Sequence, residues 1–311
     1  MRVLVTGAYG FVGRHVVAEL LGHGHQVWGY DVGVPPPGLA GMTPMEGDIR
    51  NADAVKAAVR SSKPDACIHL AAMAFVPSGA ATPEIMLDVN IMGTIRMLEV
   101  FRHEARNVRL LAISSAQVYG HKPRPAPVKE DDPFDPDSIY AISKAAVDQT
   151  SLLYARQNGM DISVVRPHNH IGPGQSPLYV VSAFARQVSE IARGGPQEIK
   201  VGNLESMRDF TDVRDVARAY RLLLDRGRAG EAYNLGSDSP LPIGDILLRL
   251  CAIARVQPAI TRDPARFRPM DRTPVLDIGK LRAATGWMPE IPLDRTLGDI
   301  MQAHLDRGGA P

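Results

Sequence analysis

The first half of the chain alternates short apolar runs with longer stretches whose apolar residues recur at helical spacing. Residues 2–7 (RVLVTG) are predicted to form a buried strand, residues 11–24 a helix that ends at glycines, and residues 26–31 a second strand. Later strands are predicted at 66–71, 109–114 and 161–166, and helices at 83–104 and 138–157. Because strand–helix–strand units connect by right-handed crossovers, this rhythm predicts a doubly wound α/β fold with a parallel sheet.

The regular alternation weakens after residue 167. Residues 166–179 (RPHNHIGPGQSPLY) are rich in proline, glycine and polar side chains, which is typical of a boundary. Beyond it, helices are predicted at 180–195 and 212–226 and a strand at 231–236. We therefore expect a first domain at 1–167, to which parts of 210–250 return, and a smaller mixed α/β substrate domain over most of 168–311.

Composition narrows the possible partners. The 311 residues are 45% hydrophobic and carry a net charge of +1, with no long basic run, so a small molecule is expected rather than nucleic acid or an anionic membrane. Cys67 and Cys251 lie in apolar runs and are predicted to be buried free thiols. The start of the chain lacks a leader pattern, and no apolar stretch approaches about 18 residues, so a cytoplasmic protein is expected.

A glycine-rich turn follows the first predicted strand. Gly7, Gly10 and Gly13 form G-x-x-G-x-x-G, with Phe11 and Val12 opening the helix. Glycines let backbone N–H groups approach a pyrophosphate, which the helix N-terminus then favours through its dipole. Such a turn alone is a weak signal, but here it opens a βαβ unit, which predicts a Rossmann-type dinucleotide-binding domain.

Asp31 closes the second predicted strand and bears on which dinucleotide binds. A carboxylate there accepts hydrogen bonds from a ribose 2′-hydroxyl and repels a 2′-phosphate, so NAD(H) is favoured. NADP(H) stays open because the Arg14 guanidinium could reach a phosphate; the alternative is an exposed helix arginine. The further cofactor candidates, each of which could also be a plain strand-end residue, are Asp48, Ile49, Leu70, Ala71 and Ala72.

Tyr140 and Lys144 lie four residues apart on a predicted helix, so they share one face. A nearby ammonium is expected to lower the pKa of the tyrosine, which could then exchange a proton, and the lysine could bond the cofactor ribose. The alternative is an aromatic and a cation on a helix surface. Ser115, at the end of the preceding strand, offers a hydroxyl to a substrate oxygen and favours the catalytic interpretation.

The chain resembles the extended short-chain dehydrogenase/reductases that act on nucleotide-linked sugars. The resemblance covers nearly the full length, through TGAYGFVG, Asp31, HLAA, DVNIMGT, SSAQVYG, YAISK and VRPHNHIGPGQ. It implies that Ser115, Tyr140 and Lys144 are the catalytic residues and that Asn90 has a structural role near them.

The position that carries an acidic residue in the 4,6-dehydratases of this family is neutral here. The matching residues are Ala116 and Gln117, and an amide is a poor proton donor or base. A 4-keto reductase or an NAD-dependent 4-epimerase therefore fits better than a dehydratase. A non-catalytic NAD(H)-binding sensor is the alternative from another class.

The segments at 202–220 and 263–297 resemble most closely the GDP-4-keto-6-deoxy-D-mannose reductases. This resemblance implies a GDP-linked sugar substrate whose C4 ketone is reduced. Arg208 and Arg268 match the family's pyrophosphate and ribose contacts, and Asn169 its polar contact to the nucleotide sugar, although any one arginine could be a solvated surface charge. Gln117 is a further substrate candidate, and Arg266 is a weaker one.

Two further expectations concern metals and assembly. His168 and His170, at i and i+2, could share a strand face, but no third ligand with suitable spacing is evident, so no metal is predicted. The resemblance also implies a homodimer, built through the apolar stretches at 85–101 and 141–155; those stretches could equally be internal core.

Overall fold

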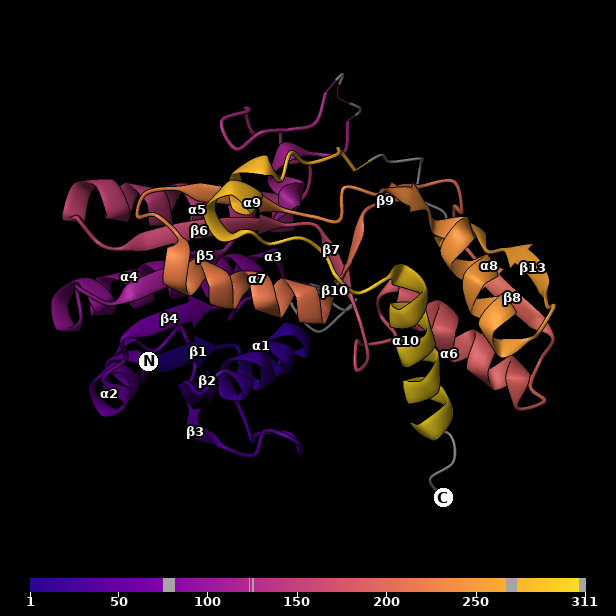
Figure 1. Cartoon of the computed structure of the whole chain (residues 1–311), viewed down its shortest axis with the longest axis horizontal. Coiled ribbons are helices and arrows are strands. Elements are labelled where there is room, and N and C mark those ends of the chain that lie inside the picture. The colour runs from indigo at the N-terminus through magenta and orange to yellow at the C-terminus, as the bar shows by residue number, and fades with distance from the viewer. Residues whose placement is uncertain (75–81, 123, 125, 267–272, 308–311) are drawn as a thin grey trace.

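A parallel sheet of seven strands forms the centre of the larger half (Figure 1). The computed structural model describes residues 1–74, 82–122, 124, 126–266 and 273–307. The strand order is β11-β6-β5-β4-β1-β2-β3, and all neighbouring pairs are parallel. Their bounds are β1 Arg2–Thr6, β2 Gln26–Asp31, β3 Met42–Glu46, β4 Ala66–His69, β5 Arg109–Ile113, β6 Ile162–Pro167 and β11 Ala232–Leu235. The predicted doubly wound α/β fold is confirmed.

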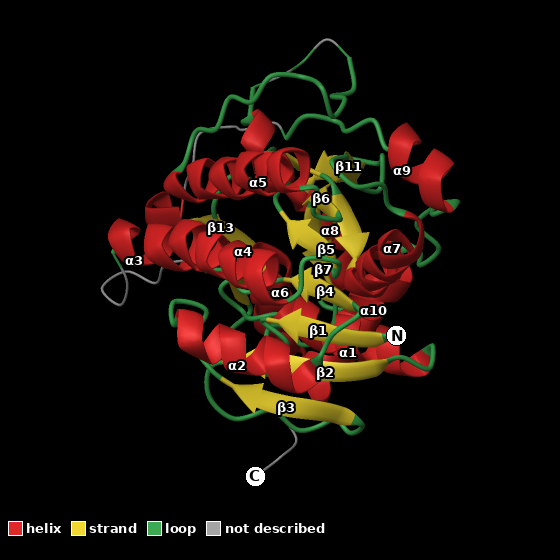
Figure 2. Cartoon of the chain, turned by 90° about the vertical axis from the view of Figure 1, so that its left-hand side faces the viewer, coloured by secondary structure: helices red, strands yellow, loops and turns green. Residues whose placement is uncertain are grey.

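Two layers of helices cover the sheet, one on each face (Figure 2). One layer contains α1 (Phe11–Gly22), α7 (Val213–Arg226) and α9 (Gly279–Thr285); the other contains α2 (Ala52–Ser62), α4 (Gly93–Glu104) and α5 (Ile139–Asn158). Strand β1 shows why both layers are needed: Val3 and Val5 are buried in the α1 layer and Leu4 in the other. Successive strand side chains point to opposite faces, so an apolar run requires cover on both.

The stretch predicted as one helix at 83–104 contains three segments. It begins with α3 (Pro83–Leu87), passes through a π-helical turn (Asp88–Met92) and continues as α4. Asn90 lies in the π-helical turn and is buried. A π-helical turn inserts an extra residue into the helix ladder and is often found at functional sites.

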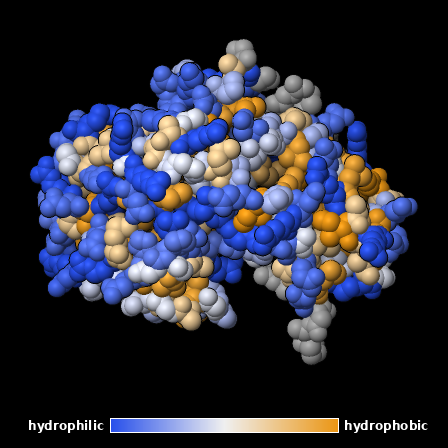
Figure 3. All heavy atoms as spheres, viewed as in Figure 1, coloured by the Kyte–Doolittle hydropathy of each residue, from blue (hydrophilic) through white to orange (hydrophobic). Residues whose placement is uncertain are grey.

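The smaller half packs around its own apolar core. Helices α6 (Val180–Ala192), α8 (Ile243–Ala254) and α10 (Leu293–Arg307) contribute to it, together with β8 (Glu198–Val201), which pairs with β13 (Ala259–Arg262). Two short pairs lie between the halves: β7 (Asn169–Ile171) with β10 (Phe210–Asp212), and β9 (Met207–Arg208) with β12 (Leu241–Pro242). The 3₁₀ turns are η2 (Ala116–Tyr119) and η3 (Pro264–Arg266). Figure 3 shows a notch in the lower outline where the two halves meet.

The chain passes between the halves more than once. After β10 it returns to the larger half as α7 and β11, then leaves for α8, and returns again as α9, which packs on α7 and β11. At the first return, Asp212 caps α7 by accepting from the Arg214 backbone N–H, and it also accepts from Thr296 Oγ1 of α10 at 2.6 Å. This buried carboxylate thus links helices of both halves.

Within the described residues, no helix combines the length and the apolar character needed to cross a bilayer. Cys67 and Cys251 are both buried and neither forms a disulfide. Burial raises the pKa of each thiol, so both stay protonated at neutral pH.

Candidate active site

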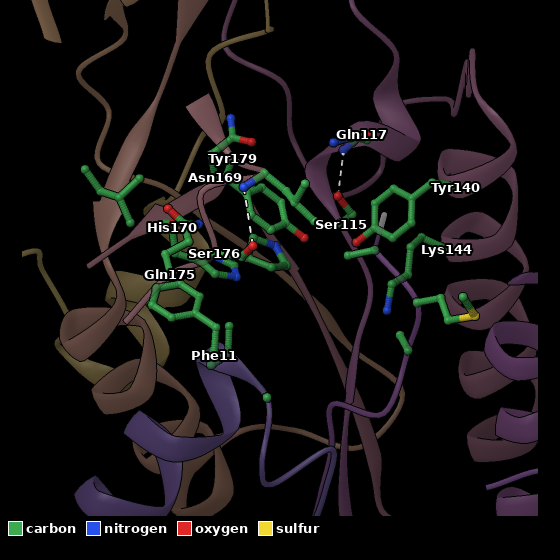
Figure 4. Close-up of a pocket in the computed structure, with 18 of the residues that line it drawn as sticks. Phe11, Ser115, Gln117, Tyr140, Lys144, Asn169, His170, Gln175, Ser176 and Tyr179 are labelled. Carbon is green, nitrogen blue, oxygen red and sulfur yellow. Dashed lines mark hydrogen bonds between the residues drawn. The ribbon is translucent and has the colours of Figure 1, made fainter. Parts of the chain in front are cut away.

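A cleft of ≈ 1500 Å³ runs along the carboxyl ends of the sheet strands and into the smaller half. Its lining comes from both halves, which is the usual place for a ligand in an open α/β sheet. Figure 4 shows two groups of side chains facing each other across it. One group contains Ser115, Gln117, Tyr140 and Lys144, and the other is the set Asn169, His170, Gln175, Ser176 and Tyr179.

The glycine turn is shaped by close backbone contacts. Gly7 has φ +71°, and a Cβ there would lie 2.8 Å from the Ala71 backbone nitrogen. A Cβ on Gly13 would lie 2.2 Å from the Gly7 carbonyl oxygen, so neither position accepts a side chain. Helix α1 begins after Gly10 without a side-chain cap, which leaves the N–H groups of Phe11 and Val12 in its first turn for a ligand. These features fit a dinucleotide pyrophosphate.

Asp31 lies at the end of β2, beside the glycine turn. Its two carboxylate oxygens accept from the backbone N–H groups of Tyr9 and Val32, each at 2.8 Å. Each oxygen keeps further capacity to accept, so the fixed carboxylate fits the two hydroxyls of a ribose.

The remaining nucleotide-end candidates also line the cleft: Asp48, Ile49, Leu70, Ala71 and Ala72. Asp48 already accepts from the Arg50 guanidinium, with the closest approach at 2.6 Å, and this hydrogen bond lowers the pKa of the Asp48 carboxyl. Arg50 lines the cleft and was not selected from the sequence. An arginine that follows a strand-end Asp by two residues could have been recognised as its ion-pair partner.

From the sequence, Arg14 could contact a phosphate or be an exposed helix arginine. Its Nη2 donates to the Gly174 carbonyl at 3.1 Å, and the neighbouring His15 Nε2 donates to the Pro173 carbonyl at 3.2 Å. Arg14 is not among the residues that line the cleft. The guanidinium joins α1 to the loop after β7, and Arg14 is partly buried, so it is not an exposed helix arginine. A phosphate contact by Arg14 stays a prediction.

Ser115 follows β5 and caps the 3₁₀ turn η2. Its Oγ accepts from the Gln117 backbone N–H at 3.2 Å, which leaves its own hydrogen available for donation (Figure 4). The serine is 7% exposed and lines the cleft together with the Gln117 side chain. A fixed hydroxyl of this kind can bond a substrate oxygen.

Tyr140 and Lys144 lie in the first turns of α5, where Ser138 caps the helix by accepting from the Ala141 N–H. Lys144 Nζ is 6.0 Å from the centre of the Tyr140 ring and donates to the Ile113 carbonyl at 2.8 Å. Figure 4 shows the Tyr140 ring beside Ser115, with the lysine ammonium below both.

The pKa of Tyr140 differs from the expectation. Burial raises it to about 12, whereas a hydrogen bond with Ser115 acts in the opposite direction. Burial lowers the pKa of Lys144 to about 8. The expected lowering of the tyrosine pKa by the ammonium is therefore wrong for this structure, because removal from water disfavours the phenolate more than its neighbours stabilise it. Tyr140 is consequently a phenol that holds its proton for donation.

Asn90 supports the start of α5. Its side-chain nitrogen donates to the Met73 carbonyl at 3.0 Å and to Ser143 Oγ at 2.9 Å, and its oxygen accepts from the Met73 N–H at 2.7 Å. Ser143 in turn donates to the Tyr140 carbonyl at 2.8 Å. The π-helical turn thus fixes the catalytic helix against the loop that follows β4.

The opposite wall carries polar atoms without protein partners. In the described part of the chain, His170 Nδ1 and Gln175 Oε1 are buried and make no hydrogen bond. Gln175 Nε2 donates to the His170 carbonyl at 2.9 Å, which orients its free oxygen. On this wall the sequence predicted only Asn169 as a substrate residue, and it suggested His170 only as a metal ligand. His170 and Gln175 are distinguished by buried atoms without partners. Such atoms depend on the fold and have no sequence signal.

Not every predicted substrate residue can be placed. Arg208, in β9, lines the cleft, whereas Arg268 lies outside the described residues. Arg266 ends η3, and only its backbone is described. His168 lines the cleft floor, and its Nε2 donates to the Pro274 carbonyl at 2.9 Å. In the part of the chain that the structure describes, no group of three His, Cys, Asp or Glu side chains could hold a metal.

The chain is similar to known enzymes over almost all of its length. The model of the GDP-mannose 4,6 dehydratase family matches residues 4–300. GDP-6-deoxy-D-mannose reductase from Pseudomonas aeruginosa is 35% identical over 310 residues, which cover 96% of each chain. The solved structure of RMD from Pseudomonas aeruginosa complexed with NADPH is 32% identical, with a TM-score of 0.86 over 99% of this chain and 100% of that one.

A second solved structure extends this comparison to another activity. The UDP-glucose 4-epimerase of Thermus thermophilus, in complex with NAD, is 30% identical, with a TM-score of 0.87 and complete coverage of both chains. Both solved structures share the fold described above. The chain belongs to the GDP-mannose 4,6 dehydratase family, among the extended short-chain dehydrogenase/reductases.

Proposed function

We propose that this protein is a nucleotide-sugar oxidoreductase that reduces the C4 ketone of GDP-4-keto-6-deoxy-D-mannose with a nicotinamide cofactor. The proposal rests on one observation: a single cleft is lined by Ser115, protonated Tyr140 and buried Lys144. At ≈ 1500 Å³ the cleft exceeds the range of about 300 to 1,000 Å³ that one small ligand occupies, so it has room for a dinucleotide and a nucleotide sugar.

The proposed chemistry divides among three side chains. The bound cofactor supplies the hydride that goes to C4, and Tyr140 donates the proton that the ketone oxygen gains. Ser115 hydrogen-bonds the same oxygen and so stabilises the charge that develops on it. Lys144, fixed by the Ile113 carbonyl, bonds the cofactor ribose and keeps a positive charge close to the tyrosine. Orientation and electrostatics are therefore the protein's main contributions.

The neutral side chain of Gln117 favours reduction over elimination of water. It lines the cleft beside Ser115, where a dehydratase needs a carboxylate to move the second proton. For the substrate, Asn169 and Arg208 line the far part of the cleft and, with Arg268, are proposed to bind the GDP moiety. The GDP-6-deoxy-D-mannose reductase similarity supports this choice of nucleotide sugar.

NADH is the proposed preferred cofactor, and NADPH is accepted less well. Asp31 presents a carboxylate where a 2′-phosphate would lie. Arg14 is turned toward Gly174, and Arg50 is paired with Asp48, so neither guanidinium is free to neutralise that phosphate.

The direct test follows NADH oxidation by the purified protein with GDP-4-keto-6-deoxy-D-mannose, beside NADPH and a dTDP-linked keto sugar. The Tyr140→Phe variant should bind NADH as the parent does but turn over at least about a hundredfold more slowly, because the phenol proton is lost. Tyr154→Phe, on the same helix with its hydroxyl bonded to Glu99, is the control and should keep its rate. Unchanged turnover in Tyr140→Phe would refute the assigned role.

An NAD-dependent nucleotide-sugar 4-epimerase is the second candidate, favoured by the similarity to the Thermus thermophilus UDP-glucose 4-epimerase bound to NAD. An epimerase oxidises and re-reduces the same carbon, so it keeps its cofactor through the cycle. Denatured protein should then release stoichiometric NAD(H), and sugar epimerisation should need no added cofactor. Firm NADH binding without any turnover of either sugar would instead support the non-catalytic sensor.

We also propose that the two halves bind different ligands and that the protein is a homodimer. The larger half, with α7, β11 and α9, would bind the dinucleotide, and the smaller half would bind the nucleotide sugar.

The proposed homodimer would form through α4 and α5. These helices lie side by side, and α5 exposes Ile142 (46%) and Leu153 (41%), with Met92 (42%) nearby. Light scattering should give twice the chain mass, and Ile142→Glu should shift it toward one chain; Leu248→Glu, on α8, should not.

A further inference from the structure

Tyr220 is a buried tyrosine whose hydroxyl makes no hydrogen bond. It lies in α7, its side chain is 0% exposed, and among the described residues the hydroxyl has no partner. Folded proteins rarely leave a buried hydroxyl unsatisfied, because such a group gives up its bonds to water without replacement. We therefore expect the hydrogen-bond partner of the Tyr220 hydroxyl to come from a molecule other than this chain.

Tyr220 lies beside the cleft and is one of the residues that line it. Helix α7 begins directly after β10, between the two halves of the molecule (Figure 1), and helical side chains tilt toward the N-terminus of their helix. This tilt favours a Tyr220 hydroxyl directed toward the β10 end of α7.

Tyr220 lines the same cleft as Tyr140. Burial raises the pKa of Tyr220, and the electrostatic effect of Tyr140 acts in the same direction. The two tyrosines come from opposite helix layers: Tyr140 from the α5 layer and Tyr220 from the α1 and α7 layer. A raised pKa keeps Tyr220 protonated, so its hydroxyl can donate a hydrogen bond.

We propose that the Tyr220 hydroxyl is a further cofactor-binding group that donates a hydrogen bond to the carboxamide of the nicotinamide. At the Tyr140 end of the cleft, a dinucleotide offers ribose hydroxyls and a carboxamide. Lys144 and Tyr140 approach from the α5 layer and are assigned to the ribose and the substrate ketone. The carboxamide oxygen is then the acceptor left for a donor from the α7 layer. This inference rests on the nicotinamide cofactor of the proposed function.

The test compares two ligands that differ in the nicotinamide. Calorimetry or fluorescence titration gives the Kd of NADH and of ADP-ribose, which lacks the nicotinamide, for the parent and for Tyr220→Phe. Loss of one hydrogen bond should weaken NADH binding about fivefold and leave ADP-ribose binding unchanged. Parent protein that binds no NADH would refute the proposed cofactor, whereas equal NADH affinity of parent and variant would refute the Tyr220 inference alone.

Thermal stability separates a ligand-binding hydroxyl from a structural one. Without ligand, Tyr220→Phe removes an unsatisfied hydroxyl from the core, so its Tm should equal or exceed that of the parent. The matched control is Tyr233→Phe: this residue is 1% exposed in the same core, but its hydroxyl accepts from the Arg228 N–H at 3.0 Å, and it does not line the cleft. The control should lower Tm and leave both ligand affinities unchanged.

Two results would overturn the inference. One is a lower Tm of Tyr220→Phe with unchanged NADH affinity, which would mark the hydroxyl as structural. The other is an equal loss of affinity for NADH and ADP-ribose, which would mark a general disturbance of the site. Support requires weaker NADH binding, unchanged ADP-ribose binding and an undiminished Tm together.

Discussion

Burial sets the protonation states of Tyr140, which is proposed to donate a proton, and of Lys144, which is proposed to keep a positive charge beside it. Tyr140, with its pKa raised to about 12, keeps its proton across the physiological range, as a proton donor must. Lys144, with its pKa lowered to about 8, is largely charged at pH 7 and loses that charge just above neutrality. We therefore expect the lysine, and not the tyrosine, to limit activity on the alkaline side.

The pH dependence of reduction tests this assignment. kcat/KM should fall as the pH rises through about 8, because neutral Lys144 no longer supplies its charge. In Lys144→Arg the guanidinium stays protonated, so the alkaline fall should move to higher pH even if the rate at pH 7 is lower. Lys122→Arg, at an exposed lysine paired with Asp135, should leave the profile unchanged. An unmoved profile in Lys144→Arg would contradict the role of the lysine.

The site candidates differ in how far the sequence could locate them. Gly7 and Gly13 could be predicted because close backbone contacts there admit no side chain. Asp31 could be predicted because a carboxylate at the end of the second strand suits a ribose. Tyr140 and Lys144 could be paired from helical spacing alone. The environment that sets their pKa values could not be predicted, and neither could Tyr220, whose importance arises from a missing partner in a folded core.

At the scale of elements, helix α5 is held to the sheet by a buried ion pair. Arg166 of β6 donates to the Asp148 carboxylate of α5 at 2.7 and 2.9 Å, and these side chains are 2% and 0% exposed. The same guanidinium donates to Tyr119 Oη at 2.7 Å and to the Glu130 carbonyl at 2.6 Å. The pair thus fixes the helix that carries Tyr140 against both β6 and η2.

Removing one partner of this buried ion pair should destabilise the fold. Asp148→Ala leaves a guanidinium buried without its counter-charge, which should lower the free energy of unfolding by about 3 kcal/mol or more. Chemical denaturation of the purified protein measures the change. Glu104→Ala, which removes the ion pairs of Glu104 with the exposed side chains of Arg60 and Lys56, is the control and should shift the midpoint far less. Similar shifts for both variants would show that burial does not govern the interaction.

Element types were easier to predict than their internal detail. The strand at 26–31 and the helix of α5 could be predicted from apolar period and propensity. The π-helical turn at Asp88–Met92 could not, because its apolar pattern is that of an ordinary helix. Asn90 explains its presence: an extra residue in the helix places this side chain against Met73 and Ser143.

At the scale of the whole molecule, α1 and the loop after β7 join the two halves beside the cleft. Arg14 and His15 both donate to this loop, at Gly174 and Pro173. A Cβ on Gly172 would lie 2.5 Å from Val213 Cγ1, so the loop is also tightly packed against the start of α7. Gln175 follows Gly174 in this loop; it lines the cleft, and its Oε1 has no hydrogen-bond partner among the described residues. The larger half thereby positions part of the cleft wall that belongs to the smaller half.

Removing the Arg14 hydrogen bond at this junction should weaken binding of the keto sugar more than binding of the cofactor. Arg14→Met keeps the apolar stem and removes the donor, so KM for the keto sugar should rise about three- to tenfold. The Kd of NADH should change less than about twofold, since Arg14 does not line the cleft. Arg186→Met, at an exposed arginine of α6, should change neither value. A weakened NADPH affinity in Arg14→Met would support the phosphate-contact interpretation.

The sequence by itself determined the parallel α/β order, the glycine turn and the spacing of the catalytic helix, because each depends on local residue type and period. Tertiary structure alone decided which residues share the cleft: α7, β11 and α9 return to the larger half from distant positions, and Arg14 turns to the smaller one. Burial and the choice of partner depend on contacts between segments far apart in the chain. No local pattern carries that information, so only the folded chain could show that Tyr220 has no partner and Tyr140 holds its proton.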